Sequence, residues 1–557
     1  MFAKRLVATL TGLAMAGGLT ACATNAPTTP PSFISVYGSE PQNPLIPTNT
    51  TETGGGSILE NLFVGLVEYE TDGTPYNEVA KSITPNKDST EFRVKLKDGW
   101  TFSNGESVTA DSFIDAWNFG ANKKNAQLGA DFFANIEGYD AIGASEDDEG
   151  GGEEGAAGSG GKEANGGKLS GLVKVNDREF LVKLSNPEST FPNRLGYTAY
   201  APLPKVAFKD MKAFGQHPIG NGPYMMDGDD AWTHNINARL KKNPNFAGKK
   251  KPQNDGLDFR FYTNLDTAYA DVQSGDLDTT RDSVGPNALA SYKADFPDSH
   301  SQKAKASIES FSIPYSLEHF QDDEEGRLRR AALSMAIDRK LITEKLFFKT
   351  RQPAEDFGSP TLGNMPDIKG KDVLTYQPEE AKKLWAKADK IRPWSGQTFE
   401  IAYNSDGGHQ SWVEAVTNSI RQTLDIKAQG KPYPTFKGLR DDVVNKNVNA
   451  GYRTGWMGDY PSIANFLEAP QYRTQGSSND SGYSNKAFDG KLNEAARQST
   501  PKKAAKVYDQ AQAMLMRDLP QIPLWYGTAS TVWNPKIKNF ETGWDGQPIY
   551  TEMVKED

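Results

Sequence analysis

Residues 452–467, YRTGWMGDYPSIANFL, are the stretch that says most about this chain. They gather a guanidinium, an indole, a carboxylate and a phenol around two glycines, so both signs of charge lie beside accessible main chain. An extended chain can pair with a short strand through main-chain hydrogen bonds, while charged groups beyond the strand hold its two ends. We expect Asp459 to bind an ammonium group and Arg453 a carboxylate, around one small space. The alternative is an ordinary loop in which Arg453 pairs with Asp459 and Trp456 is core.

Composition indicates a globular protein with several cores. The chain has 557 residues and 37% hydrophobic content, enough for two or three domains. Half of its net charge of -10 comes from residues 145–168, which hold seven acids and two bases. Neither a nucleic-acid partner nor a basic membrane-binding face is indicated. The five scattered histidines give no metal-ligand spacing, so we expect no metal and no cofactor.

The first residues have the pattern of an export signal. Lys4 and Arg5 precede an apolar run at residues 6–19, which is too short for a stable membrane span. The run leads into Leu19-Thr20-Ala21-Cys22, and Cys22 is the only cysteine of the chain. This resembles a bacterial lipobox, which predicts a signal peptide at 1–21 and a membrane anchor on lipidated Cys22. The alternative is a plain signal peptide cut after an Ala-x-Ala site. Residues 22–32 then form a tether.

Periodicity outlines a mixed α/β chain. Apolar residues at 57–66 predict a helix, and the alternation in EFRVKL (91–96) and EFLVKL (179–184) predicts strands. After about residue 300, helices alternate with strands such as 398–403. Residues 145–168, rich in glycine and acids, predict a flexible surface insert. Residues suited to helix ends accompany the pattern: Thr109, Asp338 and Thr500 as N-caps, and Gly275 as a stop.

Five stretches in this order resemble one family, the oligopeptide-binding proteins among the family 5 extracytoplasmic solute-binding proteins of ABC importers. Besides residues 452–467 they are LFVGL (62–66), LKDGWTFSNGESVTADSFIDAW (96–117), GNGPY (220–224) and RAALSMAIDR (330–339). The resemblance covers nearly the whole mature chain. It implies a two-lobed clamshell of the periplasmic-binding-protein kind (type II, cluster C) with an extra domain. The implied division is a first lobe from 33–69, 200–300 and 527–557, an extra domain at 70–199 carrying the insert, and a second lobe at 301–526.

The resemblance also implies roles for individual residues. Asp459 matches the aspartate that binds a peptide's α-ammonium group, and Arg453 lies where the terminal carboxylate is held. The main chain of Gly455 and Met457 is implied to pair with the ligand, and Trp456 to form a wall of the site. His409 is implied to contact the terminal carboxylate. Thr53, within residues 51–53, is implied to form the opposite main-chain edge. The alternatives are that His409 is an exposed loop histidine and that Trp456 is only wall.

The implied activity is capture of oligopeptides and their delivery to an ABC permease and ATPase complex, by a monomer without enzymatic function. The expected location is the outer face of the cell membrane, on a Gram-positive surface. One rival is the same fold binding an oligosaccharide stacked on Trp412, Trp456 and Tyr483, or another small solute. A secreted hydrolase is the second rival, but the chain has no GxSxG or HExxH motif, and Cys22 is assigned to lipid. A surface scaffold would need repeats, and we find none.

Overall fold

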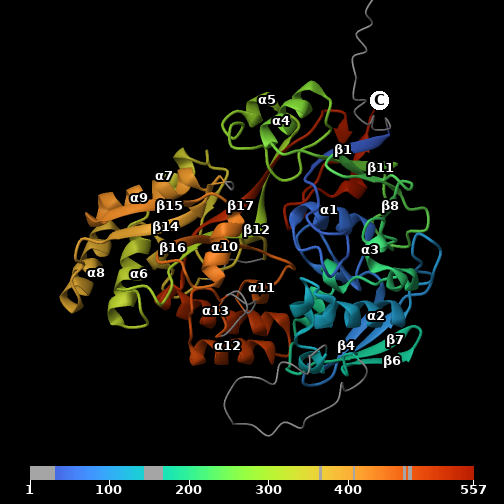
Figure 1. Ribbon diagram of the computed structural model, residues 1–557, viewed down its shortest axis with the longest axis horizontal. Coiled ribbons are helices and arrows are strands. Elements are labelled where there is room, and N and C mark those ends of the chain that lie inside the picture. The colour runs from blue at the N-terminus through green and yellow to red at the C-terminus, as the bar shows by residue number, and fades with distance from the viewer. Residues whose placement is uncertain are drawn as a thin grey trace, which may run out of the picture.

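The computed structural model describes residues 32–142, 167–362, 367–405, 408–467, 472–474 and 479–556. The predicted signal peptide, Cys22 and nearly all of the acidic insert lie outside these ranges. Figure 1 shows two halves side by side, with β12 (His300–Ser312) and β17 (Gln521–Val532) joining them. Within the ranges given, no helix is long and apolar enough to cross a membrane.

The N-terminal half contains two main sheets. In the first, the order is β1-β11-β10-β8, with β9 paired to β10, and β1 runs parallel to β11. The second has the order β4-β5-β7-β6. The bounds are β1 Phe33–Gly38, β8 Tyr224–Met226, β9 Trp232–Thr233, β10 Asn237–Lys242, β11 Gly256–Phe261, β4 Ala80–Pro85, β5 Glu91–Leu96, β6 Leu172–Asn176 and β7 Glu179–Lys183. The two predicted strands, β5 and β7, are confirmed and pair antiparallel.

Helices and short strands complete this half. They are α1 Thr53–Leu62, α2 Ala110–Ala121, α3 Met211–Phe214, α4 Leu265–Ser274, α5 Tyr292–Asp295, and the pairs β2 Val67–Tyr69 with β3 Pro75–Asn77 and β18 Ile537–Lys538 with β19 Val554–Lys555. One large core cluster includes side chains from α1, α2 and both main sheets. These elements therefore pack as one body.

The other half is built on a six-stranded sheet of order β13-β17-β12-β16-β14-β15. The remaining strands are β13 Gln352–Pro353, β14 Thr398–Asn404, β15 Lys427–Tyr433 and β16 Gly451–Met457. The helices are α6 Glu324–Met335, α7 Arg339–Lys345, α8 Pro378–Ile391, α9 Gln410–Leu424, α10 Phe436–Val444, α11 Ile463–Leu467, α12 Lys486–Ala496 and α13 Pro501–Asp518. The predicted mixed α/β character after residue 300 is confirmed.

The predicted helix ends are largely correct. Thr109 caps α2, Asp338 accepts the Leu341 amide, and Thr500 accepts the Lys503 amide. Gly275 ends α4 with φ +85°, a conformation that favours glycine.

The first helix is the exception. The sequence predicted it at 57–66, but it begins at Thr53, because the Glu52 side chain accepts the Gly55 amide. It ends at Leu62, whose carbonyl accepts the Gly222 amide at 2.8 Å. The apolar residues at 63–66 are buried although they are not helical. Their spacing in the sequence therefore looked like a continuation of the helix.

Candidate binding cleft

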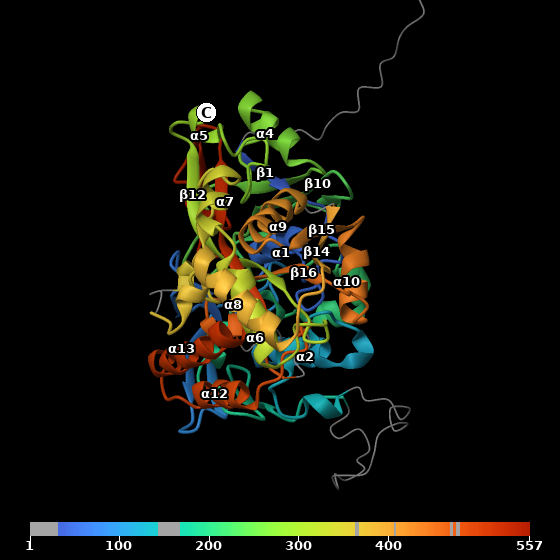
Figure 2. The same ribbon diagram turned by 90° about the vertical axis from the view of Figure 1, so that its left-hand side faces the viewer.

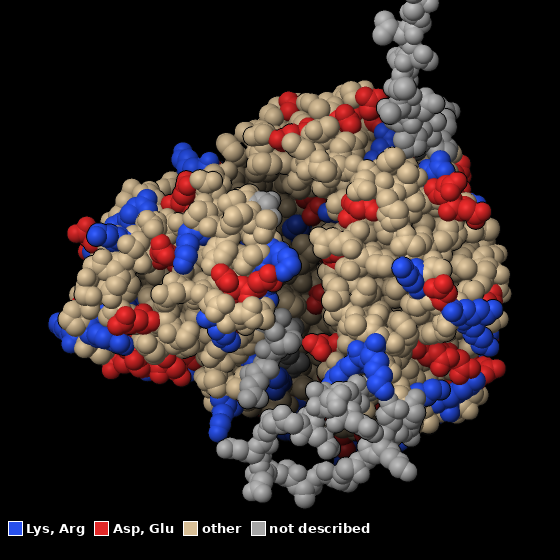
Figure 3. All heavy atoms as spheres, viewed as in Figure 1, with Lys and Arg blue, Asp and Glu red and all other residues tan. Residues whose placement is uncertain are grey.

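A deep hollow separates the two halves. Figure 3 shows it running down the middle of the molecule, with acidic and basic atoms visible inside. Figures 1 and 2 together place α1 across this hollow from β16. The stretch at 452–467 and the first helix therefore face one another.

The first feature of the cleft is the main chain of β16. It pairs with β12 from Tyr452 to Met457, but with β14 only at Gly451 and Tyr452. From Thr454 to Met457, its other edge has no partner strand within the described part of the chain. An exposed strand edge of this kind can add an extended peptide through main-chain hydrogen bonds.

Asp459 lies just beyond the end of this edge. Asn465, on α11 and 2% exposed, holds it in place: the Asn465 amide group donates to Asp459 Oδ2 at 2.9 Å, and its oxygen accepts the Asp459 main-chain amide at 2.9 Å. The same oxygen accepts Trp456 Nε1 at 2.9 Å. Desolvation raises the pKa of Asp459 to about 6, against the opposing effects of Asn465 and Arg194. The carboxylate is thus fixed in position and mostly ionised at neutral pH.

Residues of the other half reach Asp459. Arg194, at the end of the 3₁₀ turn Phe191–Arg194, lies with its guanidinium carbon 5.4 Å from the centre of the Tyr460 ring and pairs with Glu188 at 2.5 Å. Desolvation and the nearby charge of Asp459 raise the pKa of Tyr197. Sequence reasoning missed Arg194 and Tyr197, because only the fold brings their segment to Asp459. It also missed Asn465, although this residue lies in the same stretch as Asp459.

Arg453 lies at the other end of β16. Its Nε donates to Asn404 Oδ1 at 2.9 Å, and its guanidinium carbon lies 4.9 Å from the centre of the Phe436 ring. Four residues of strand, about 13 Å, lead from Arg453 to Met457, and Asp459 follows two residues after the end of β16. The strand separates them, so they can hold the two ends of a ligand.

A second charged group surrounds Glu309 near Arg453. Burial raises the pKa of Glu309, and Arg351 and Arg453 oppose this rise. His409 Nδ1 lies 3.7 Å from Glu309 Oε1 and accepts a hydrogen bond from Trp412 Nε1 at 3.0 Å. The side chain of His409 is only 14% exposed, so it is not an exposed loop histidine. Arg351 is a further residue that the sequence did not single out.

Three further predicted contacts remain to be placed. Thr53 is the first residue of α1 and not part of an extended edge, because the Glu52 cap starts the helix there. Gly455 is opposite Glu309 in the sheet, and a Cβ on it would come 2.7 Å from the Ile308 carbonyl oxygen. Met457 ends β16 and is 41% exposed. The structure brings Gly455, Trp456, Met457 and Asp459 together along one edge.

The aromatic residues of the sugar-binding alternative are mostly core. Trp412 and Tyr483 are 4% and 3% exposed. Tyr483 donates from its hydroxyl to Asp518 Oδ2 at 2.9 Å. Of the three, only Trp456 has a partly exposed ring that a ligand could contact.

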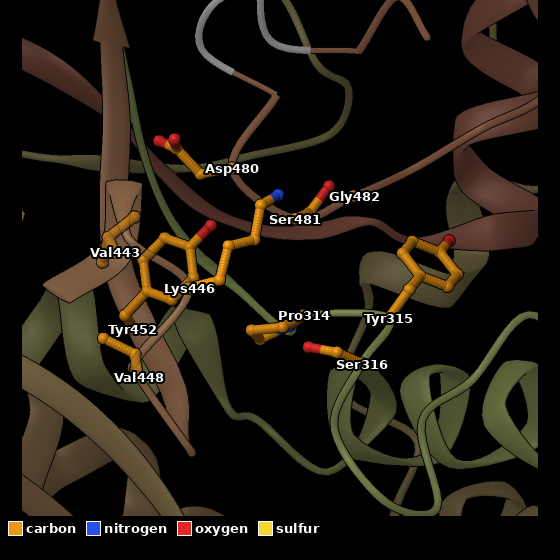
Figure 4. A pocket seen from close by; sticks show the side chains of 10 residues that line it. All are labelled: Pro314, Tyr315, Ser316, Val443, Lys446, Val448, Tyr452, Asp480, Ser481 and Gly482. Carbon is orange, nitrogen blue, oxygen red and sulfur yellow. The ribbon is translucent and has the colours of Figure 1, made fainter. Parts of the chain in front are cut away.

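A separate pocket of about 200 Å³ lies at the start of β16. In Figure 4 the Tyr452 ring and the Lys446 side chain lie on one side of it and Tyr315 on the other. Its rim carries the Arg440–Asp480 ion pair at 2.6 Å. Because Tyr452 is at the opposite end of the strand from Asp459, this pocket is apart from the ammonium site.

Comparison with known proteins identifies a matching family model and similar proteins. The sequence model of the bacterial extracellular solute-binding proteins, family 5 middle, matches residues 74–478. The chain is 25% identical over 516 residues to the oligopeptide-binding protein OppA of Bacillus subtilis, covering 89% of this chain and 87% of the relative. It is likewise 25% identical over 494 residues to the dipeptide-binding protein DppE of the same organism, covering 86% and 84%.

Solved structures share the fold. The Haemophilus influenzae OppA complex with the peptide RPPGFSPFR matches with a TM-score of 0.73 at 22% identity, covering 94% of this chain and 99% of that chain. The murein tripeptide binding protein MppA of Escherichia coli matches with a TM-score of 0.72 at 22% identity, covering 94% and 98%. The predicted two-lobed clamshell is confirmed.

Proposed function

We propose that this chain, which belongs to the bacterial extracellular solute-binding proteins of family 5, captures oligopeptides between its two halves and delivers them to an ABC permease and ATPase complex. The observation that carries the proposal is the open edge of β16, with a fixed carboxylate at one end and a cluster of arginines at the other. Relatives named for oligopeptide and dipeptide binding support it.

The chemistry of a peptide matches this edge. Its main chain is the same for every sequence, so strand pairing supplies affinity without selecting side chains. Asp459 binds the terminal ammonium group, and Arg453, with Arg351 and His409 near it, binds the terminal carboxylate. Their positions beyond the two ends of the open edge fit a short extended peptide. Trp456 forms the wall, and the main chain of Gly455 and Met457 pairs with the ligand.

The experiment is native mass spectrometry of residues 23–557 as purified, followed by denaturation and sequencing of whatever is released. We expect a set of co-purified peptides of similar length. An empty protein that binds oligosaccharides and not peptides would keep the fold and overturn the roles of Asp459 and Arg453.

We further propose that the protein acts as a monomer and is anchored by lipid on Cys22 to a Gram-positive surface. We also propose that its domains are divided as predicted from the sequence. The lipobox-like residues before Cys22 support the anchor. In detergent phase partition, the wild type should enter the detergent phase and Cys22→Ser the aqueous phase. If the two partition alike, the anchor is absent.

A further inference from the structure

The imidazole of His409 is held on one side by the indole of Trp412. His409 is the residue before α9, and Trp412 lies in the first turn of that helix. The indole therefore turns back toward the imidazole: Trp412 Nε1 lies 3.0 Å from His409 Nδ1, and the two ring planes are at 89° to each other. This contact ties His409 to a core residue of its half.

The chemistry of the contact fixes where the proton of a neutral His409 lies. An indole N–H can only donate a hydrogen bond, so His409 Nδ1 has to accept it and carries no proton. In a neutral imidazole the proton is then on Nε2. The opposite tautomer would bring two N–H groups against each other, and the hydrogen bond would be lost.

Glu309 gives independent support for the same tautomer. Its Oε1 lies 3.7 Å from His409 Nδ1, and this buried oxygen has no hydrogen-bond partner within the residues that the structure describes. A protonated Nδ1 would have this carboxylate beside it as an acceptor, and charge-assisted hydrogen bonds are stronger than neutral ones. An Nδ1 without a proton leaves the oxygen as it is found.

Core packing keeps the indole in place. Trp412 is 4% exposed, and its ring lies edge to face against Trp525, with 5.6 Å between the ring centres. Trp525 is fully buried and packs against Phe347 with 5.0 Å between the ring centres. The N–H group of Trp412 therefore keeps one direction. Of the two rings, the indole is the one that fixes the other.

The sheet register connects this pair with the proposed carboxylate end of the site. Glu309 is opposite Gly455 of β16, the strand that carries Arg453, and opposite Trp525 of β17. A terminal carboxylate only accepts hydrogen bonds. A ring with its proton on Nε2 offers that nitrogen as a donor, whereas the opposite tautomer would turn a lone pair toward the carboxylate.

We propose that Trp412 is a positioning residue for the carboxylate end of the site: its indole N–H keeps the proton of His409 on Nε2, so that the ring meets a peptide's terminal carboxylate as a hydrogen-bond donor. The inference rests on the proposed function, because the carboxylate has to be that of a bound peptide. It gives a buried tryptophan a role in recognition that acts through His409 alone.

The first test reads the tautomer directly. We would record ¹⁵N NMR spectra of residues 23–557 labelled in histidine, at pH 8, where an ordinary histidine is neutral. The His409 signals are identified by their loss in His409→Ala. We expect a bare Nδ1 and a protonated Nε2 in the wild type, and a mixture of tautomers in Trp412→Phe, which keeps an aromatic ring but lacks the N–H. Trp385→Phe, at another buried tryptophan of the same half, should leave the signals unchanged.

The second test measures the consequence for binding. Calorimetric titration at pH 8 compares tetraalanine with its carboxyl-terminal amide. Trp412→Phe should weaken binding of the free acid about fivefold relative to the amide, the effect of one hydrogen bond, and Trp385→Phe should not change this ratio. In the His409→Ala background, Trp412→Phe should cause no further change in the ratio, because a positioning residue acts only through the residue it positions.

The outcomes separate the two proposals. If tetraalanine fails to bind the wild type, the proposed function is wrong. If it binds but the wild-type ring carries its proton on Nδ1, only the role of Trp412 is wrong, and this result needs no variant to fold. The role of Trp412 is also wrong if Trp412→Phe keeps the ratio of acid to amide, or if its loss persists in the His409→Ala background.

Discussion

At the residue scale, the proposed ammonium site depends on the Asp459 carboxylate and on the Asn465 side-chain amide that holds it in place. Asn465 uses its oxygen on the Asp459 amide and on Trp456, and its nitrogen on the carboxylate. The Asp459 side chain therefore needs little reorganisation when a ligand arrives, which favours binding. Asp459 was predictable as a residue type in the right stretch. Asn465 was not, because an asparagine in a helix carries no pattern of its own.

Removing the charge should separate peptides by their amino end. Asp459→Asn keeps the shape of the side chain but lacks the charge that attracts an ammonium group. We expect it to weaken binding of a free peptide by about 2 kcal/mol, roughly thirtyfold. The N-acetylated peptide should bind wild type and variant alike in calorimetric titration. Equal losses for both peptides would refute the ammonium role.

The pKa of Asp459 gives a pH dependence of binding. Burial raises it to about 6 in the free protein, and only the ionised form attracts an ammonium group. At pH 5 about one tenth of the molecules carry the charge, so affinity for a free tetraalanine should be roughly tenfold lower than at pH 7. The Asp459→Asn variant, measured over the same range, should show a flat profile. A wild-type profile that is flat from pH 7 to 5 would contradict the assignment.

At the scale of single elements, β16 combines packing on one side with an open edge on the other. Its glycine permits the close approach of β12, and the short contact with β14 leaves the edge available. The conspicuous motif RAALSMAIDR has a different role. Arg330 and Arg339 are buried and donate to main-chain carbonyls, among them those of Phe320 and Pro523. Charged residues usually indicate surface, so sequence reasoning could not place them in the core.

Gly455 should be intolerant of even one methyl group. A Cβ would meet the Ile308 carbonyl oxygen at 2.7 Å, and that atom is main chain, so the two strands have to move apart. We expect Gly455→Ala to lower the free energy of unfolding by about 1–3 kcal/mol in urea titration. Gly490→Ala is the matched control: it lies inside α12 with no atom within 4 Å and should be neutral or slightly stabilising. Equal stability of the two variants would show that β12 can yield.

At the scale of the whole molecule, two long strands join the halves on either side of the cleft. The register of β12 against β17 shifts between Ala304 and Ile308, and opposite this point a Cβ on Gly527 would come 1.9 Å from the Ser307 hydroxyl oxygen. The open edge of β16 and helix α1 belong to different halves. Binding therefore depends on how the halves face each other.

The acidic insert should be dispensable for this arrangement. The chain before it is tied to the chain after it, because the Gly171 amide donates to the Glu137 carbonyl at 2.9 Å. Leu169, just beyond the insert, is buried. Replacing residues 145–168 by Gly-Ser-Gly should change the melting temperature by no more than about 2 °C and leave peptide affinity unchanged. A large fall in melting temperature would make the insert structural.

The sequence by itself determined the elements with regular patterns and the family, because alternation, helix caps and ordered motifs are local properties of the chain. It identified Asp459 and Arg453 as the residues expected to hold the two ends of a ligand. Only the tertiary structure decided that β16 keeps an open edge, that α1 starts at Thr53, and that Arg194 and Tyr197 approach Asp459 from the other half. These residues come from segments hundreds of positions apart, and their charges act on one another only after folding has removed the water between them.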